Sequence, residues 1–596
     1  MPLHFYVEQG DVNSVLKQLA QGADVNEFSK FSGKTPLICA LERTSKNIES
    51  DLELIRLLIE RGADVDLAVD NRFGRFHGTP LLAAVQMRSL AKVKLLLEAG
   101  ANTCLQGKFA HLLMDALVAY DDGLGYPIPS RGTDSLCSIL NVLIEYGAAL
   151  EAAYVDHQSG FRTTAVVRAS SEGWFDAVRL LLAAGADPEP LRWNELMRAI
   201  ALDPIEQLET LLAKTKNLNT QLLETDHYQR TPWLLSLVVG DLAKVERLFL
   251  AEADHCAGSA YYGSASVECA IVGDSAAALN WLVDLGIDLP EVTSQGLTPV
   301  MQAATYGSVE CLKLLIELGA DIFETVRYGD RAIHLARKRE IIDILCAAGE
   351  SLSNIEEEML PLVTGVRQLE MGLSQKQFLS GRERRFGQTI PEQTEIAFWR
   401  AMVASNYSAY WVASKFGFQE DRSAPRQPTW CFKRFGRSIT ALPDGRVIAI
   451  AGEHEDFYDP DFCIYNDIVV YDAQGNFEIF SYPQEIFPPT DFHSATLIDN
   501  SIYIIGNLGY ANARITGETP VYKLNCKNLA IREIKTTGNK PGWISTHSAQ
   551  YNGSDGIIIS GGKISGQRNG KLDYYDNSET YVLNLSTLTW RQIESH

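Results

Sequence analysis

The densest group of potential metal ligands in this sequence lies between residues 453 and 461. It consists of Glu453, His454, Glu455, Asp456, Asp459 and Asp461. Carboxylate oxygens can bind calcium, and an imidazole beside them extends the choice to transition metals. The spacing matches no known metal-binding loop, and a solvated acidic turn has the same composition. We predict no metal here, and we keep Glu453, His454, Asp456 and Asp461 as candidate binding residues.

Two histidines occur in matching contexts, in His493-Ser494-Ala495 and in His547-Ser548-Ala549. Matching contexts indicate equivalent positions in a repeated unit, so both side chains should lie at one end of a domain. Structural hydrogen bonding is the favoured role for such repeated histidines. Catalysis or metal binding is the alternative, and we keep His493 and His547 as candidates on the same face.

Motifs of known catalytic loops are absent or incomplete. Ser32-Gly33-Lys34-Thr35 ends like a phosphate-binding loop, but Phe28 stands where that loop requires glycine. The sequence contains no Gly-x-Ser-x-Gly nucleophile motif. We therefore expect no cofactor and favour a non-enzymatic protein. An enzyme with a metal or small-molecule site in the C-terminal β domain is the alternative.

The elements that would position these residues begin with a repeat in the first 350 positions. The repeated segments are Gly22-Ala23-Asp24-Val25, Gly62-Ala63-Asp64-Val65, Gly185-Ala186-Asp187 and Gly319-Ala320-Asp321-Ile322. A second marker recurs between them, at Thr35-Pro36-Leu37, Thr79-Pro80-Leu81, Thr231-Pro232-Trp233 and Thr298-Pro299-Val300. Proline is tolerated in a first helical turn, threonine caps that turn, and glycine ends a helix in the left-handed conformation. Each unit is therefore predicted to be a pair of helices.

This pattern resembles the ankyrin repeat, in which a turn precedes a Thr-Pro-Leu helix and a Leu-rich helix that ends in Gly-Ala-Asp. The resemblance implies an α-solenoid of about ten units over residues 1–350, two or three of them degenerate. Ankyrin arrays bind proteins through their turns and first helices, and aromatic and arginine side chains are frequent interface anchors. By position, the candidate anchors are Phe31, Arg72, Phe73, Tyr154, Phe161, Tyr228, Arg327 and Tyr328. Some of these side chains are expected to fold back onto their own repeat.

Residues 351–429 are predicted to form a helical connector, and its aromatic second part should pack against a neighbouring domain. From residue 430 the pattern changes to short strands. Three hydrophobic runs end in glycine, at Val447–Gly452, Ile502–Gly506 and Ile557–Gly562, and each has a strand before it and two after it. These units resemble kelch blades, so we predict an all-β domain of about three four-stranded blades over residues 430–596. Propellers usually have four to eight blades. An open stack, assembly between chains, further blades beyond the chain or an unrelated β-sandwich remain alternatives.

The charge of the chain argues against a nucleic-acid partner. The net charge is −22, and residues 1–350 hold 30 Lys and Arg against 47 Asp and Glu. Phosphate-binding surfaces are basic, so a neutral or basic protein partner is expected. We find no signal segment or membrane-spanning run, and the ten cysteines form no Cys-x-x-Cys pair. These features predict a soluble cytoplasmic protein that joins protein partners as a scaffold; a secreted microbial effector is a further alternative. Its oligomeric state is left open.

Overall fold

The structure is a computed structural model, and its contacts divide the chain into two units, residues 2–350 and residues 351–596. It describes residues 2–43, 47–70, 77–104, 112–117, 133–155, 162–215, 218–256, 258, 266–293, 296–326, 330–350, 352, 355, 359–366, 371–417, 428–454, 462–568 and 571–593. None of the described helices is long and apolar enough to cross a membrane.

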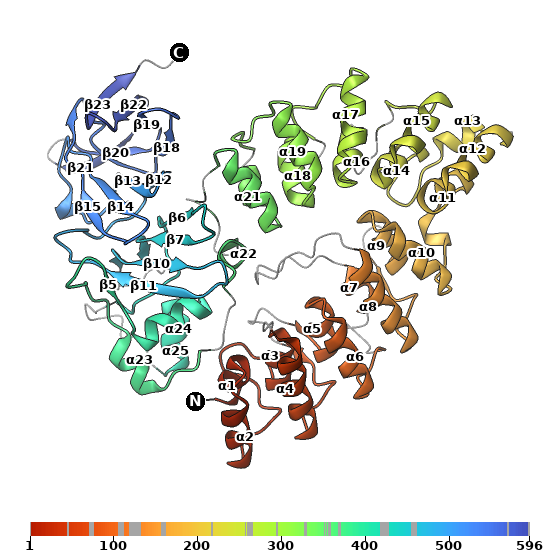
Figure 1. The fold of residues 1–596 in the computed structure, drawn as a ribbon, viewed down its shortest axis with the longest axis horizontal. Coiled ribbons are helices and arrows are strands. Elements are labelled where there is room, and N and C mark those ends of the chain that lie inside the picture. Colours follow the sequence, from red (N-terminus) through yellow and green to blue (C-terminus); the bar gives the residue numbers. More distant parts are fainter. Residues whose placement is uncertain are drawn as a thin grey trace. The chain divides into compact units, whose positions relative to one another are not determined.

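The described part of the first unit contains ten successive helix pairs (Figure 1). The first helices of the pairs are α1 (Leu3–Gln9), α3 (Pro36–Glu42), α5 (Pro80–Gln86), α7 (Leu112–Leu117), α9 (Ala165–Ser171), α11 (Glu195–Leu202), α14 (Pro232–Val239), α16 (Ser266–Val272), α18 (Pro299–Tyr306) and α20 (Ala332–Leu335). The second helices are α2 (Val12–Ala20), α4 (Ile48–Glu60), α6 (Leu90–Glu98), α8 (Thr133–Glu145), α10 (Phe175–Ala183), α12 (Ile205–Lys214), α15 (Leu242–Leu250), α17 (Ala276–Asp284), α19 (Val309–Glu317) and α21 (Arg339–Ala347). One extra helix, α13 (Leu218–Leu223), lies between the sixth and seventh pairs.

The predicted helix starts and stops are confirmed. The hydroxyls of Thr35, Thr79, Thr231 and Thr298 each accept a hydrogen bond from the amide three residues later, and proline occupies the first helical position. Glycines follow the second helices with φ between 82° and 110°, at Gly22, Gly62, Gly100, Gly147, Gly185, Gly286, Gly319 and Gly349. A residue with a Cβ would be strained in this conformation, so glycine ends these helices. In the sixth pair Asn194 replaces threonine as the cap, accepting from the Met197 amide at 2.9 Å.

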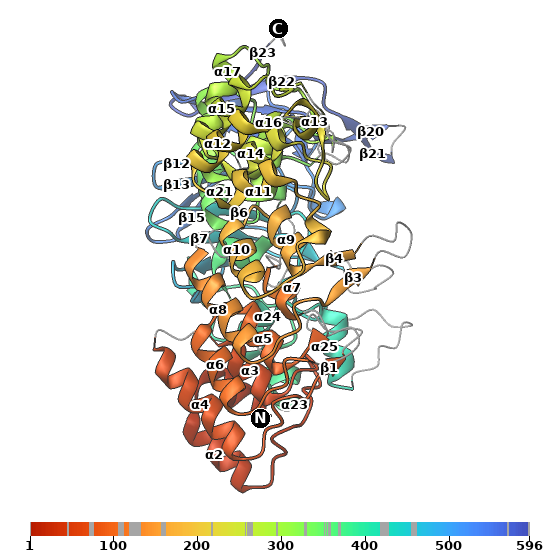
Figure 2. The same ribbon diagram turned by 90° about the vertical axis from the view of Figure 1, so that its right-hand side faces the viewer.

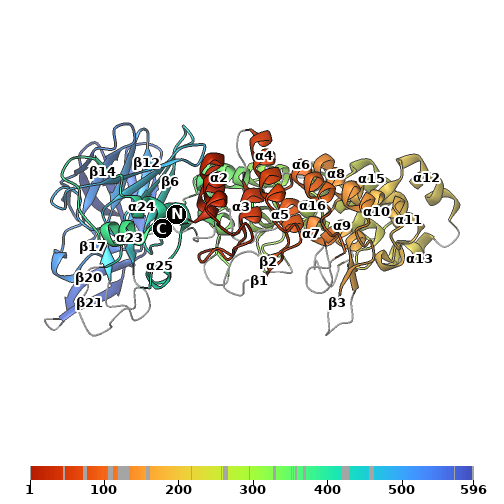
Figure 3. The ribbon, with the colours of Figure 1, turned by 90° about the horizontal axis from the view of Figure 1, so that it is seen from below.

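The pairs stack through their first helices, which pack in sequence from α1 to α9 and again from α11 to α20. The second helices form a parallel row, visible with α4, α6 and α8 in Figure 3. Leucine and alanine fill the interface between the rows, and side chains such as Leu58, Leu96 and Leu181 are completely buried. The buried stripe of each helix therefore requires the neighbouring repeats.

Hydrogen bonds from a following repeat also close several of the helix ends. Lys244, in α15, is 6% exposed and donates to the carbonyls of Ile200 and Asp203 at 2.7 Å each, at the end of α11. Lys92 donates to the carbonyl of Leu41 at 2.8 Å, and Ser308 to that of Ile271 at 2.6 Å. The last carbonyls of a helix have no partner within the helix, so these side chains satisfy them from the next repeat.

The second unit contains three antiparallel four-stranded meanders. The first has β6 (Ser438–Ala441), β7 (Val447–Ile450), β10 (Ile468–Tyr471) and β11 (Phe477–Ser481), with β5 (Glu392–Gln393) added beside β11. The second has β12 (Ser494–Ile498), β13 (Ser501–Ile505), β14 (Val521–Asn525) and β15 (Ile531–Glu533). The third has β18 (Ser548–Tyr551), β19 (Gly556–Ser560), β22 (Thr580–Asn584) and β23 (Thr589–Ile593), with β16 (Thr537–Gly538) beside β23. The predicted strands are thus found, and the described strands form no closed barrel or propeller.

The three sheets meet at their first strands, because β6 contacts β12 and β12 contacts β18. One apolar layer joins the first two sheets, through Ile448 and Ile504, and another joins the second and third, through Ile505 and Ile559. Among the described residues, the other face of the third sheet is not covered by such an apolar layer. Ser548, Gln550 and Arg591 on that face are exposed. The described sheets therefore form a stack in which each sheet shares an apolar layer with the next.

The free side of the first sheet is covered by the aromatic segment that precedes it. Its helices are α22 (Leu360–Thr364), α23 (Gln375–Gly381), α24 (Ala397–Ser405) and α25 (Ala409–Lys415). Trp399 of α24 stacks on Trp430 with ring centroids 4.7 Å apart, and both rings are fully buried. Arg400 lies over the ring of Phe477, in β11. The aromatic segment therefore packs against the first β-sheet, which confirms the expected packing against a neighbouring part of the chain.

Replacing Lys244 with methionine should destabilise the array locally, because the carbonyls at the end of α11 would lose a buried charged donor. We expect a cost of about 2 kcal/mol, measured as faster native-state hydrogen exchange in α11. Lys313→Met is the matched control, since Lys313 is an exposed lysine paired with Glu310. This control should change the free energy of opening of α11 by less than about 0.5 kcal/mol. Equal effects of the two substitutions would contradict the capping role.

Candidate functional site

The array has an exposed β-hairpin finger between its fourth and fifth helix pairs. Strands β3 (Ala153–Val155) and β4 (Arg162–Thr164) pair antiparallel, with Tyr154 opposite Thr163. Figure 2 shows the hairpin standing out from α7 and α9. The side chain of Tyr154 is 64% exposed and that of Arg162 is also exposed. Tyrosine and arginine are the residue types that most often dominate binding energy at interfaces, so this finger is a candidate binding site.

Two other predicted anchors are more deeply buried than Tyr154. Phe31 is 4% exposed and lies within its repeat. Tyr228 is half-buried, packs edge-to-face on His227 with ring centroids 5.0 Å apart, and lies under the guanidinium of Arg230. Burial raises the pKa of the Tyr228 hydroxyl. These rings therefore stabilise their own repeats, as expected for some of the set.

The remaining anchors, Arg72, Phe73, Phe161, Arg327 and Tyr328, lie outside the described residues. A second short hairpin, β1 (Val69–Asp70) with β2 (His77–Gly78), flanks the segment that contains Arg72 and Phe73. The sequence analysis missed Phe28, which is 48% exposed three residues before the buried Phe31, and Phe323, which is 40% exposed. Both residues follow a Gly-Ala-Asp segment, and this position in the repeat could have marked them as candidate anchors.

In the second unit, the long connections between the second and third strands of the three sheets carry exposed aromatic residues. The connections contain the hairpin β8 (Glu453–His454) with β9 (Cys463–Ile464), the turn η5 (Ala511–Ala513), and the hairpin β20 (Lys563–Arg568) with β21 (Lys571–Asp576). A further short strand, β17 (Trp543–Ser545), pairs with β20. We define the connection surface as Phe462, Tyr510, Arg514, Ile515, Tyr574 and Tyr575.

Hydrogen bonds and ring contacts tie the three connections together. The ring of Phe462 meets Tyr510 edge-to-face at 5.7 Å, and the hydroxyl of Tyr510 accepts from the Ile464 amide at 2.9 Å. Arg514 donates to the carbonyls of Leu508 and Gly509, each at 2.8 Å, and to the hydroxyl of Tyr574. No sequence pattern pointed to Tyr510, Arg514 or Tyr574, because the connections differ in length and share no spacing.

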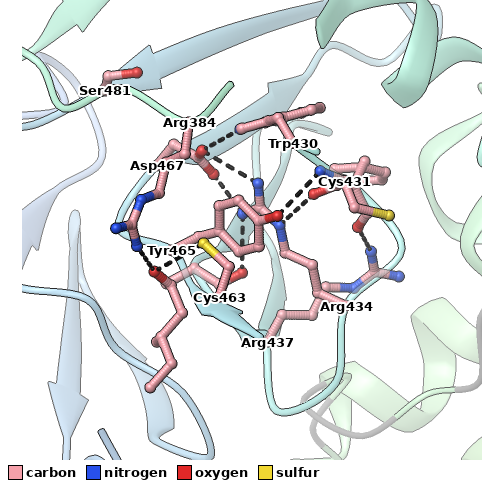
Figure 4. A network of polar contacts seen from close by, with 12 residues as sticks. Arg384, Trp430, Cys431, Arg434, Arg437, Cys463, Tyr465, Asp467 and Ser481 are labelled. Carbon is pink, nitrogen blue, oxygen red and sulfur yellow. Dashed lines mark hydrogen bonds and ion pairs between the residues drawn. The ribbon is translucent and has the colours of Figure 1, made fainter. Parts of the chain in front are cut away.

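A buried ion pair holds the end of the first of these connections, just before β10 (Figure 4). Arg434 forms a two-point ion pair with Asp467, and Trp430 Nε1 donates to the same carboxylate at 2.8 Å. The guanidinium carbon lies 3.5 Å from the ring centroid of Tyr465. Burial raises the pKa of the Tyr465 hydroxyl well above its usual range. This network holds the segments before β6 and β10 in place and has no exposed reactive group.

The two repeated histidines join neighbouring sheets. His493 Nε2 and Ser438 Oγ form a hydrogen bond of 2.7 Å between the second and first sheets, and His547 Nε2 and Ser494 Oγ form one of 2.9 Å between the third and second. Burial lowers the pKa of His493 to about 3, with a smaller contribution from His547, and lowers that of His547 to about 4. Both imidazoles are therefore neutral near pH 7, in the structural arrangement that the sequence analysis favoured.

The acidic segment is only partly described. Glu453 and His454 form β8 and are 7% and 3% exposed, while Asp456 and Asp461 lie outside the described residues. Within the described parts of the chain, no group of three or more His, Cys, Asp or Glu side chains is placed to hold a metal ion. The backbone places Glu453 next to the segment that enters the second sheet, because the Gly452 amide donates to the Thr490 carbonyl at 2.9 Å.

Comparison with known proteins identifies the first unit. A family model of ankyrin repeats in three copies matches residues 3–106 and 266–355. The chain is 30% identical over 196 residues to the ankyrin repeat protein nuc-2 of Neurospora crassa, covering 33% of this chain and 16% of that protein. It is 41% identical over 71 residues to an ankyrin repeat protein of fowlpox virus, covering 12% of this chain and 16% of that protein. It is 25% identical over 189 residues to the ankyrin repeat protein YahD of Escherichia coli, covering 30% of this chain and 94% of that protein. The N-terminal region therefore consists of ankyrin repeats, a class of repeat associated with protein–protein interaction.

Replacing Arg434 with methionine should destabilise the β-sheets by about 3–5 kcal/mol, because Asp467 would remain as a buried unpaired charge. The effect is measured as increased hydrogen exchange in β10. Arg446→Met breaks a more exposed pair with Asp444 and should cost less than about 1 kcal/mol. If Arg434→Met lowers the stability of the sheets no more than this control does, the supporting role of the network is refuted.

Acid should weaken the contacts between the sheets. The unfolded chain takes up protons below the ordinary histidine pKa of 6.5, whereas folded His493 and His547 stay neutral down to about pH 3 and 4. Stability should therefore fall as the pH drops from 6.5 to 4, by up to about 1.4 kcal/mol per pH unit for each histidine. The measurement is the opening free energy of β12 by hydrogen exchange at several pH values. His547→Gln should reduce the slope and His255→Gln, at an exposed histidine of the array, should not; a slope unchanged by His547→Gln would contradict this assignment.

Proposed function

We propose that this protein is a non-enzymatic scaffold that joins protein partners in the cytoplasm. The ankyrin array, residues 1–350, would bind one partner, and the connection surface of the β unit would bind another. The observation that carries the proposal is the finger formed by β3 and β4, where Tyr154 is 64% exposed on a paired strand. An aromatic ring held in place by a paired backbone loses little conformational freedom on binding.

The charge of the array supports a protein partner that is basic or neutral. With 30 basic against 47 acidic residues, residues 1–350 would repel the phosphates of a nucleic acid. Opposite charge on a partner would speed its association. A membrane partner is not part of the proposal, and neither is a cofactor.

We infer that residues 430–596 are a kelch-like domain, preceded by a connector over residues 351–429. Three meanders joined at their first strands, with glycines Gly452, Gly506 and Gly562 at equivalent strand ends, support this inference. At Gly506 and Gly562 a Cβ would lie 2.4–2.5 Å from a backbone carbonyl of the segment that enters the third sheet. Glycine is therefore required where the sheets meet, as expected of a repeated blade. Two binding sites on one chain would raise the effective concentration of one partner near the other.

The proposal is tested by asking whether a substitution in the finger removes the binding of one specific partner. Wild-type full-length protein and a Tyr154→Ala variant are used to capture proteins from native lysate. A protein retained by the wild type and lost by the variant is then purified, and its Kd is measured for both. We expect Tyr154→Ala to weaken binding by at least about 30-fold, the range of an interface hot spot.

The matched control is Tyr146→Ala, which removes a tyrosine that is 47% exposed just after α8 rather than on the finger. Its Kd should stay within about twofold of the wild-type value. Equal losses for the two variants, or no protein that depends on Tyr154, would refute the finger as the binding site. Turnover of a substrate by the purified β unit would support the rival enzyme instead.

A further inference from the structure

Three neighbouring repeats of the array expose apolar side chains where their second helices end. The helices are α15, α17 and α19, which pack in sequence (Figure 1). The side chains belong to the last residues of these helices or to the turns that follow, and they are between 40% and 70% exposed. We define the helix-end row as Leu250, Leu285, Val292, Leu318 and Phe323.

The packing of the repeats does not require large apolar residues at these positions. Leu285 and Leu318 each stand just before the left-handed glycine that ends the second helix. The third and fifth helix pairs have Ala99 and Ala184 at the equivalent position. Single exposed apolar side chains are normal in proteins, whereas a group of them on neighbouring elements is typical of an interaction site.

The surroundings of the helix-end row are acidic. Residues 249–256, 284–292 and 317–325 contain eight Asp and Glu and no Lys or Arg. All eight carboxyl side chains are exposed, and none of them forms an ion pair with another described residue. The C-termini of three helices add partial negative charge to the same surface. A partner that fits here must therefore combine apolar side chains with positive charge.

The length of the row fits a short helix. Packed helices lie about 8–10 Å apart, so the ends of α15, α17 and α19 span roughly 20 Å. A peptide helix rises about 1.5 Å per residue, so about 14 residues reach across all three ends. An amphipathic helix places its apolar side chains on one stripe and can carry lysine or arginine on both sides of that stripe.

We propose that the helix-end row binds a basic amphipathic helix of a partner protein. The apolar stripe of that helix packs on Leu285, Leu318 and Phe323, and its lysines or arginines lie beside flanking carboxylates such as Glu291 and Glu317. Burial of the apolar side chains supplies affinity, and the opposite charges speed association and select against acidic helices. The row belongs to other repeats than the β3–β4 finger, so this inference does not rest on the proposed function.

The first test uses a synthetic peptide as the probe. The peptide has about 14 residues, all leucine or lysine, with leucine at every third or fourth position so that one helical face is apolar. Its Kd for the full-length protein is measured at low and at physiological ionic strength, beside a control peptide with glutamate in place of lysine. The lysine peptide should bind, more weakly as the ionic strength rises, and the glutamate peptide should not. Failure of the lysine peptide to bind, or equal binding of the two peptides, would overturn the proposal.

The second test locates the bound peptide through the apolar residues. Leu285→Gln combined with Leu318→Gln should raise the Kd of the lysine peptide by at least about tenfold. The matched control combines Val12→Gln with Ile48→Gln, at two exposed apolar residues that begin α2 and α4. This control should keep the Kd within about twofold of the wild-type value, because exposed residues away from an interface contribute little to it. Equal losses for the two double variants would show that the peptide binds outside the row.

The third test separates a local charge effect from the net charge of the protein. Glu291→Gln combined with Glu317→Gln should raise the Kd about fivefold, since exposed ion pairs contribute modestly. Glu98→Gln combined with Glu145→Gln removes the same charge from the ends of α6 and α8 and should have a smaller effect. Tyr154→Ala should leave the Kd of the peptide unchanged, which distinguishes the row from the finger. Equal effects of the two charge variants would contradict a specific site at α15, α17 and α19.

Discussion

Several repeats of this protein depend on a neighbour to satisfy their buried hydrogen bonds. In the array, the carbonyls at the end of a first helix accept from Lys92, Lys244 or Ser308 of the following repeat. In the β unit, an imidazole of each later sheet bonds the first strand of the sheet before it. A carbonyl buried without a donor costs about 1–3 kcal/mol. The order of repeats in the sequence is therefore also their order in space, and a single repeat has no stable form of its own.

This dependence determines which polar residues are available to a partner. Lys244, Arg434 and His493 have polar groups that could bind a partner, yet each is buried and bonded to groups of an adjacent element. Two strongly exposed tyrosines lie instead on hairpins between the stacked elements. Tyr154 is on the finger of the array, and Tyr575 is 55% exposed on the β20–β21 hairpin. The candidate binding residues are thus side chains that the packing of the repeats does not use.

The sequence predicted the parts of the fold that rest on local chemistry. Thr-Pro caps and left-handed glycines depend on a few adjacent residues, and they were found where expected. The site was harder to predict, because burial is set by residues far away in the chain. Phe28 and Phe31 are three residues apart in one turn, and only the structure distinguishes the exposed ring from the buried one. Arg434 and Asp467 are 33 positions apart, and no spacing rule connects these two residues in the sequence.

The inner ends of the sheets contain two buried histidines that must stay neutral. His493 and His547 bond the first strands of the neighbouring sheets as neutral imidazoles, so these contacts weaken in acid. Proton uptake therefore acts on the junctions between the sheets, whereas Arg514 holds the connection surface through Leu508, Gly509 and Tyr574. The repeat array has a different kind of buried support: lysine and serine donors that bond backbone carbonyls between repeats.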